Sequence, residues 1–205
     1  MKKMKQQQSN KLKKYTVKSA AVDIAECAIF VALMVAGAFI QIPCVPVPIT
    51  FQTVICVLAG LLLGWKKGAI SMAVYCFAGL IGIPVFTAGG GLFYVLKPTF
   101  GYILGFILAA VVAGLLTNKR GLPFWRYLVA ALAAFVADYA VGIPYCIVAA
   151  HLSGVENLTN LLLVGNLIYM PKDAVLCTLA ALISWKVAPI INRDKRKEPE
   201  NKTDE

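Results

Sequence analysis

The fold is decided by residues 99–116, TFGYILGFILAAVVAGLL, a run of eighteen residues without a single charge. A membrane-spanning helix needs about 20 apolar residues, whereas a barrel strand would alternate polar and apolar residues over about ten. The run does not alternate. It therefore predicts a membrane helix.

The rest of the chain has the same character. Of its 205 residues, 60% are hydrophobic and 15% are charged, and the mean hydropathy is +0.75. A soluble domain carries roughly a quarter charged residues, and a disordered chain needs low hydrophobicity. Six cysteines are too few for a disulfide scaffold of this length. The composition indicates an integral membrane protein with apolar residues for about six spanning helices.

Six helices are expected, at about 24–42, 51–65, 68–83, 99–116, 124–150 and 158–187. Three prolines in residues 43–48 end the first helix, because proline cannot continue it. The second helix is short and reaches roughly 22 Å, less than the ~30 Å of the hydrocarbon core. This predicts that the proline-rich loop dips into the membrane, where protein or a water-filled cavity must cover it.

The charges predict the topology. The chain has 20 Lys and Arg against 10 Asp and Glu, and 18 of the 20 bases fall on one side if the N-terminus is cytoplasmic. By the positive-inside rule, we expect a membrane domain of residues 24–190 with both termini cytoplasmic, a basic tail 1–23 and a charged tail 191–205. The first segment is too long for a signal-peptide n-region. The net charge of +10 indicates attraction to anionic lipid rather than to nucleic acid.

Three charges fall inside the expected helices: Asp138, Lys172 and Asp173. Each costs about 2.5–3.5 kcal/mol or more at the bilayer centre, so each needs a partner or a function. Asn166 and Tyr169 share one helical stripe with Asp173. One interpretation is an ion pair between Asp138 and Lys172 that joins the fifth and sixth helices. The other is a polar pocket near the outer face for a small ligand with an amide-like ring and a carboxylate.

The expected outer loops add further polar residues. Lys97 could supply a second cation, and Thr50 and Gln52 form a rigid polar rim beside the prolines. Residues 89–91 are three glycines that lack the pattern of a phosphate-binding loop. They predict a tight, lid-like loop, with a flexible turn as the alternative.

No catalytic residues, metal site or cofactor are expected. The cysteines have no C-x-x-C spacing, His151 has no companion at ligand spacing, and no Ser/His/Asp set or nucleotide-binding motif is present. On the first helix, Ala28, Ala32 and Ala36 place one small residue per turn on one face. Such stripes allow close helix approach, either within the chain or with another subunit.

Several motifs together resemble the BioY family. They are IPCVPVPITFQT at 42–53, LAGLLLG at 58–64, GIPVF at 82–86 followed by the three glycines, and PTFGY at 98–102 with Gly105 and Phe106. BioY proteins are the biotin-binding substrate-specific components of energy-coupling factor (ECF) transporters. The resemblance covers essentially the whole chain between the tails.

The resemblance implies an all-α membrane subunit in a bacterial or archaeal plasma membrane, without enzymatic activity. Biotin would bind near the outer face under the first and third loops. The family's A-x-x-x-A contact maps onto Ala28 and Ala32, which would dock on a transmembrane coupling subunit. Two cytoplasmic ATPase subunits would supply the energy.

The family's P-x-D-x-x-K motif on the sixth helix is matched at Pro171 and Asp173, but Leu176 stands where the lysine is expected. The expected roles are hydrogen bonds to the ureido ring from Asp173, Asn166 and Gln52, ring packing by Tyr94 and Tyr169, and Lys172 or Lys97 at the carboxylate. A substrate-specific component for a different vitamin is the alternative. The full set of expected ligand-binding residues is Gln52, Thr50, Tyr94, Lys97, Asp138, Asn166, Tyr169, Lys172 and Asp173.

Overall fold

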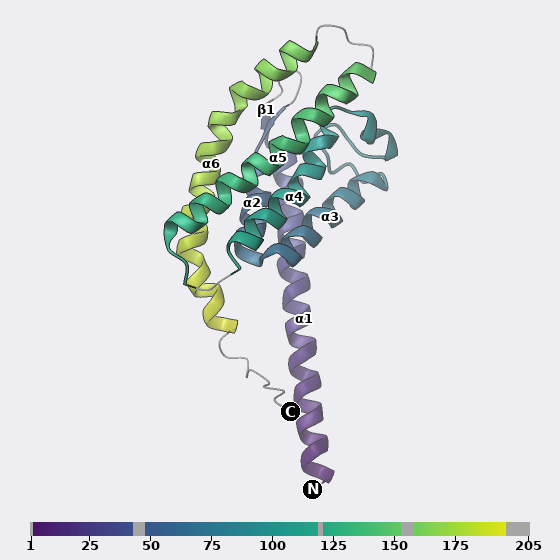
Figure 1. Cartoon of the computed structure of the whole chain (residues 1–205). Coiled ribbons are helices and arrows are strands. Elements are labelled where there is room, and N and C mark those ends of the chain that lie inside the picture. The colour runs from purple at the N-terminus through teal and green to yellow at the C-terminus, as the bar shows by residue number, and fades with distance from the viewer. Residues whose placement is uncertain (1, 43–47, 119–120, 153–157, 196–205) are drawn as a thin grey trace.

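The structure, a computed structural model, is a bundle of six α-helices (Figure 1). It describes residues 2–42, 48–118, 121–152 and 158–195, and of 2–19, 158–169 and 190–195 it describes the backbone alone. The elements are α1 (Lys2–Phe39), β1 (Gln41–Ile42), β2 (Ile49–Thr50), α2 (Gln52–Leu63), α3 (Trp65–Leu80), the 3-10 helix η1 (Leu92–Leu96), α4 (Phe100–Leu116), α5 (Phe124–Leu152) and α6 (Leu158–Lys195). The predicted all-helical architecture and the order of its helices are confirmed for this part of the chain.

Consecutive helices run in opposite directions, so their connections gather at two ends of the bundle (Figure 1). Residues 40–42 and 48–51 and the segment 81–99 lie at one end, called here the loop end. The single-residue link between α2 and α3, the last residues of α4 and the first residues of α5 lie at the other, the junction end. The first residues of α1 and the last described residues of α6 also point to the junction end, which agrees with termini on the same side.

Helix α2 is short and central. It has 12 residues and packs against each of the other five helices. Gly64 alone separates it from α3, with φ of +82°, a conformation that glycine adopts at little cost. The prediction of a short second helix is confirmed, and the helix is shorter than expected because Gly64 ends it two residues early.

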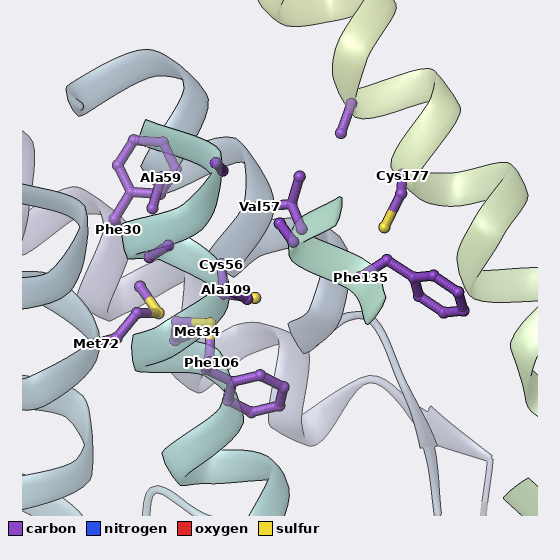
Figure 2. Close-up of a cluster of buried hydrophobic side chains, with 14 of the residues drawn as sticks. Phe30, Met34, Cys56, Val57, Ala59, Met72, Phe106, Ala109, Phe135 and Cys177 are labelled. Atoms are coloured by element: carbon purple, nitrogen blue, oxygen red, sulfur yellow. The ribbon is translucent and has the colours of Figure 1, made fainter. Parts of the chain in front are cut away.

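The core draws on every helix (Figure 2). Phe30 and Met34 of α1, Cys56, Val57 and Ala59 of α2, Met72 of α3, Phe106 and Ala109 of α4, Phe135 of α5 and Cys177 of α6 form one buried cluster. Many other buried positions hold alanine or glycine. Small side chains allow the helix backbones to approach closely.

Two helices extend beyond the expected spans. Helix α1 begins at Lys2 rather than near Ile24, so the basic segment is helical and continuous with the first apolar stretch. Its lysines and glutamines are good helix formers, and neither proline nor glycine interrupts them. Helix α6 continues through Pro171 and Pro189 to Lys195. The last ten residues of the expected C-terminal tail lie outside the described part of the chain.

A two-stranded ribbon that the sequence did not predict joins α1 to α2. Strands β1 and β2 are antiparallel, with Gln41 opposite Thr50 and Ile42 opposite Ile49. Residues 43–47, which include two of the three prolines, lie outside the described residues. The three glycines of the other loop form a tight turn, with φ of +101° at Gly89 and +108° at Gly91, as expected.

Among the described residues, two stretches are long and apolar enough to cross a membrane by length and composition, Ala20–Phe39 and Phe124–Leu152. Gln52–Leu63 and Phe100–Leu116 are apolar but shorter. By helix length and hydropathy, α1 and α5 are therefore the best supported as membrane-spanning helices.

At the junction end, Lys67 ties α3 to α1. Its Nζ lies 2.8 Å from Asp23 Oδ1 and also donates to Glu26 Oε2. Partial burial by itself would lower the pKa of Lys67, but the hydrogen bonds to the two carboxylates outweigh burial and raise it. This cluster, called here the Lys67 clamp, lies just before the apolar part of α3.

Candidate ligand-binding site

A pocket lies at the loop end, over the N-terminus of α2. It contains about 580 Å³, counting the part open to solvent, a size typical of small-molecule sites. Strand β2, the 81–99 loop and five helices contribute to its wall. The lining residues are Pro48, Ile49, Thr50, Gln52, Thr53, Tyr75, Thr87, Tyr94, Thr99, Tyr102, Ile103, Phe106, Tyr139, Lys172 and Asp173.

The charged part of the wall is a lysine–aspartate pair on α6. Lys172 Nζ lies 2.7 Å from Asp173 Oδ1 and donates to the Thr50 carbonyl at 2.9 Å. It also lies 6.0 Å from the centre of the Phe51 ring. The other carboxylate oxygen of Asp173, Oδ2, accepts a 2.6 Å hydrogen bond from the Tyr139 hydroxyl. Lys172 thereby holds β2 against α6. Oδ2 of Asp173 has a hydrogen-bond partner, and Oδ1 has the Lys172 ammonium as an ion-pair partner without a hydrogen bond.

This geometry corrects one interpretation of the sequence. Asp138 does not pair with Lys172, because Lys172 binds its sequence neighbour instead. Adjacent residues on a helix point about 100° apart, but the long stem of lysine bends back far enough to reach the aspartate. The pair therefore belongs to one helix and does not link α5 to α6.

Gln52 and Tyr75 form the polar part of the wall near α1 and α3. Gln52 Nε2 donates to the Tyr75 hydroxyl at 2.6 Å and to the Met34 carbonyl at 3.4 Å. The Tyr75 hydroxyl in turn donates to the Val85 carbonyl at 3.1 Å. Gln52 and Tyr75 are both buried. One hydrogen-bonded chain thus connects the pocket to α1 and to the 81–99 loop.

Tyr94 of η1 closes the pocket from the loop side. Its hydroxyl lies 3.0 Å from Thr87 Oγ1 and 3.1 Å from Thr99 Oγ1, and its ring centre lies 4.5 Å from that of Phe86. Only 3% of Tyr94 is exposed. Gln41 Nε2 donates to the Thr87 carbonyl at 3.2 Å, which joins the two loop-end segments. The third loop therefore covers the site, as a lid-like loop would.

The structure brings five of the nine expected ligand-binding residues to the pocket wall: Thr50, Gln52, Tyr94, Lys172 and Asp173. Lys97 is exposed and is not among the lining residues. Its Nζ donates to the Ala88 carbonyl at 3.1 Å and lies 5.0 Å from the centre of the Tyr94 ring. Asp138 is fully buried behind the wall and touches it through Thr53. The side chains of Asn166 and Tyr169 lie outside the described part of α6.

The sequence interpretation missed the hydroxyl and aromatic part of the wall. Charged residues inside a membrane helix stand out in a sequence because they are costly there, whereas tyrosine and threonine cost little and give no such signal. The spacing of Tyr102 and Phe106, four residues apart on α4, is a helical stripe that carried a usable signal. The missed lining residues are Pro48, Ile49, Thr53, Tyr75, Thr87, Thr99, Tyr102, Ile103, Phe106 and Tyr139.

On the other side of the molecule, α1 presents Ala28, Ala32 and Ala36 outward, and all three are exposed. The exposed residues around them include Ile29 and Leu33. Against the described part of the chain, the alanine stripe therefore does not serve helix packing. Its flat, apolar surface is free to meet lipid or another protein.

The pocket combines aromatic walls, several hydroxyl groups, one carboxylate and one cation. Among the described residues, no group of three or more His, Cys, Asp or Glu side chains is placed to hold a metal ion. The arrangement fits a small organic molecule that has both hydrogen-bonding groups and a negative charge.

Comparison with known proteins gives consistent matches. The model of the BioY family matches residues 4–193. The chain is 40% identical to a probable biotin transporter BioY of Lysinibacillus sphaericus over 82% of this chain and 87% of that protein, and 35% identical to the biotin transporter BioY of Thermotoga maritima over 80% and 94%. Its fold is similar to the 2.1 Å crystal structure of the S-component for biotin from an ECF-type ABC transporter. The TM-score is 0.64 and the identity 24%, over 84% of this chain and 93% of that one.

Proposed function

Because the chain belongs to the BioY family, we propose that it is the biotin-binding subunit of an ECF-type transporter and that biotin binds in the pocket at the loop end. The relatives that it matches over most of their length are named as biotin transporters. The proposed activity is high-affinity capture of biotin and its uptake, without a chemical reaction and without a cofactor.

The observation that carries the proposal is the Lys172–Asp173 pair in a wall that is otherwise aromatic and hydroxyl-rich. Biotin has a ureido ring with two N–H donors and one carbonyl acceptor, an apolar fused ring and a carboxylate on an alkyl chain. Each of these parts has a counterpart in the wall. A site buried this deeply must pair the ligand's polar groups, because an unpaired polar group is costly away from water.

The ureido ring needs acceptors and a donor. Asp173 supplies carboxylate oxygens, and Gln52 lines the same pocket with its amide held by Tyr75. Asn166 is proposed as a third hydrogen-bonding group. Tyr94 and Tyr169 are proposed to pack against the fused ring, with Thr50 at the rim.

The ligand carboxylate is assigned to Lys172 rather than to Lys97. Lys172 lines the pocket and is about one third exposed, whereas Lys97 is fastened to the outside of the loop by the Ala88 carbonyl. Leu176 occupies the position of the family lysine one helical turn beyond Asp173. We infer that Lys172 takes over the role of that missing cation.

In the membrane, we propose six spanning helices with both termini in the cytoplasm and the loop end facing outward. The membrane domain comprises residues 24–190, flanked by the tails 1–23 and 191–205. The basic residues gather at the junction end, including Lys66, Lys67 and Arg126. The proposed location is the plasma membrane of a bacterium or archaeon, with anionic lipid around the basic tail.

The exposed face of α1 is the proposed docking surface for a transmembrane coupling subunit, with Ala28 and Ala32 at its centre. Small residues there allow a partner helix to approach closely. Two cytoplasmic ATPase subunits complete the transporter. Their presence would explain how a chain without a nucleotide-binding motif takes part in energised uptake.

The proposal is tested by the small molecule that the protein retains. The full chain is purified in detergent from cells grown with biotin, thiamine and riboflavin, and the bound compound is identified by mass spectrometry. Calorimetric titration of the ligand-free protein with each vitamin follows. We expect biotin to copurify and to bind at least 1,000-fold more tightly than the others. Tight binding of a different vitamin, with weak binding of biotin, would overturn the assignment and favour another substrate-specific component.

A further inference from the structure

Asp138 is the one buried carboxyl group for which the pocket wall has no direct use. It lies midway along α5 and is fully buried. Its Oδ2 is 3.3 Å from the hydroxyl oxygen of Thr53, which lines the pocket. The proposed ligand therefore does not meet Asp138, but it meets the residue that Asp138 holds.

Among the residues that the structure describes, the surroundings of Asp138 offer an ionised carboxylate no cation and one long contact to a hydroxyl, 3.3 Å from Thr53 Oγ1 to Oδ2. None of the ion pairs in the described part of the chain includes it. Its Oδ1 has no hydrogen-bond partner there and faces Gly105, where an added Cβ would lie 2.3 Å from that oxygen. Among the described side chains, the ionisable groups that interact electrostatically with Asp138 are Asp173, Cys56, Cys177, Tyr102 and Tyr139, and none of these is a base.

Asp173 provides the contrast, since it has Lys172 on one oxygen and Tyr139 on the other. The Tyr139 hydrogen bond is 2.6 Å long, within the range of a hydroxyl that donates to an ionised carboxylate. The contact between Asp138 and Thr53 is 3.3 Å, longer than such a bond. A buried carboxyl without a cation takes up a proton rather than remain charged.

We propose that Asp138 is a protonated, neutral acid that positions the Thr53 hydroxyl as a hydrogen-bond donor toward the ligand. The acid proton is donated from Asp138 Oδ2 to Thr53 Oγ1. The single proton of Thr53 is then free to turn into the pocket. If Asp138 were ionised, Thr53 would donate its proton to the carboxylate. Its oxygen could then only accept hydrogen bonds from the ligand.

This inference rests on the proposed function, because it names the ligand group that Thr53 meets. A donor at this place fits the ureido carbonyl oxygen of biotin, while Asp173 supplies an acceptor for the ureido N–H groups. The two carboxyl groups thereby have different roles. Asp173 is a binding residue, and Asp138 is a positioning residue that acts through Thr53.

The test compares four single variants of the full chain in detergent by calorimetric titration with biotin. Asp138→Asn keeps a neutral side chain whose amide can donate to Thr53, so we expect an affinity within about threefold of the wild type. Asp138→Leu and Thr53→Val remove the donor and are expected to weaken binding at least tenfold. Thr53→Ser retains the hydroxyl and is the matched control for Thr53→Val. Equal losses in Asp138→Asn and Thr53→Val would overturn the proposal.

Infrared difference spectroscopy reports the protonation state of Asp138 directly, which a purely structural role of this residue would leave unaffected by biotin. The wild type should show the C=O stretch of a protonated carboxylic acid, which shifts when biotin binds and is absent from Asp138→Asn but present in Asp173→Asn. Absence of that band from the wild type would overturn the proposal even if the leucine variant failed to fold. Failure of the wild type to bind biotin would instead overturn the proposed function, so the two failures are distinguishable.

Discussion

The loop end and the junction end of the bundle are built from different side chains. At the loop end, two pairs of polar side chains line a pocket: Gln52 and Tyr75 share a hydrogen bond, and Lys172 and Asp173 form an ion pair. At the junction end, the helices are held by backbone proximity at small residues such as Gly60, by a one-residue link, and by the Lys67 clamp. The difference indicates that the proposed ligand site and the closest helix packing occupy separate halves of one molecule. Substitutions should therefore affect either binding or stability, depending on the end where they lie.

The largest effect is expected from Asp173→Asn at the loop end. The variant removes the negative charge that holds Lys172 and accepts from Tyr139, so we expect biotin affinity to fall 100- to 1,000-fold, about 3–4 kcal/mol. Calorimetric titration measures the affinity, and the melting temperature of the ligand-free protein serves as the control. A large drop in melting temperature without loss of affinity would show that this loop-end residue contributes to stability rather than to binding, and would contradict the comparison.

At the junction end, Gly60→Val should destabilise the bundle by about 2–3 kcal/mol. A Cβ at Gly60 would lie 2.4 Å from the Ala110 carbonyl oxygen and 2.7 Å from Ala113 Cβ, so α2 and α4 must separate. Thermal unfolding in detergent measures the loss, and Ala73→Val on the exposed face of α3 is the control with the same new side chain. The folded fraction should bind biotin normally. An affinity loss that parallels the stability loss would contradict the comparison.

A smaller effect is expected from Lys172→Ala, which leaves the pocket wall without a cation. We expect biotin to bind about tenfold more weakly, roughly 1.4 kcal/mol, whereas the uncharged methyl ester of biotin should lose little. Lys186→Ala, an exposed lysine further along α6, is the matched control. If the acid and the ester lose affinity equally, Lys172 does not meet the carboxylate.

The smallest effect is expected from Lys67→Met, which breaks the clamp between α1 and α3. Partly exposed ion pairs contribute about 0.2–1 kcal/mol, and we expect a stability loss in that range. Because the folded state raises the pKa of Lys67, this contribution is present in full at neutral pH and is lost as the pH rises through that pKa. Unfolding measured at neutral and alkaline pH checks both the size of the stability loss and its decrease at high pH, with Lys66→Met as the control. A gap between variant and wild type that widens at alkaline pH would refute the assignment.

The sequence was sufficient for the helices and for part of the site. Uncharged runs and the prolines and glycines between them predicted α2 to α6 closely at their first residues, because hydrophobic length and helix breakers are local properties. It was not sufficient for α1, where the lysine-rich segment looked like a separate tail. A chain of helix formers without a breaker continues an existing helix, and the composition alone did not show where that helix begins.

The partners of the charged residues were harder to predict. Lys172 and Asp173 were predicted to be functional from their cost in a membrane, and the structure places both in the pocket wall. Their pairing was not predicted, because it depends on the bend of a flexible side chain. Tyr75 and Tyr139 went unnoticed because their polar atoms matter through the contacts made across helices. Tertiary packing decides which donor each side-chain oxygen meets. The order of residues along one helix does not predict these contacts.

The shortness of α2 also sets how deep the pocket lies. Twelve residues make a helix about 18 Å long, and the hydrocarbon layer of a bilayer is about 30 Å thick. In the proposed topology, the C-terminal end of α2 lies beside the basic residues of the junction end, so α2 would stop about 12 Å short of the opposite surface. The pocket, which lies over the N-terminus of α2, would occupy that missing length. The floor of the site is therefore at a depth that changes with the lipids around the protein. In a thinner bilayer the same residues would lie nearer to water. Ligand affinity should therefore depend on bilayer thickness as well as on the residues of the chain.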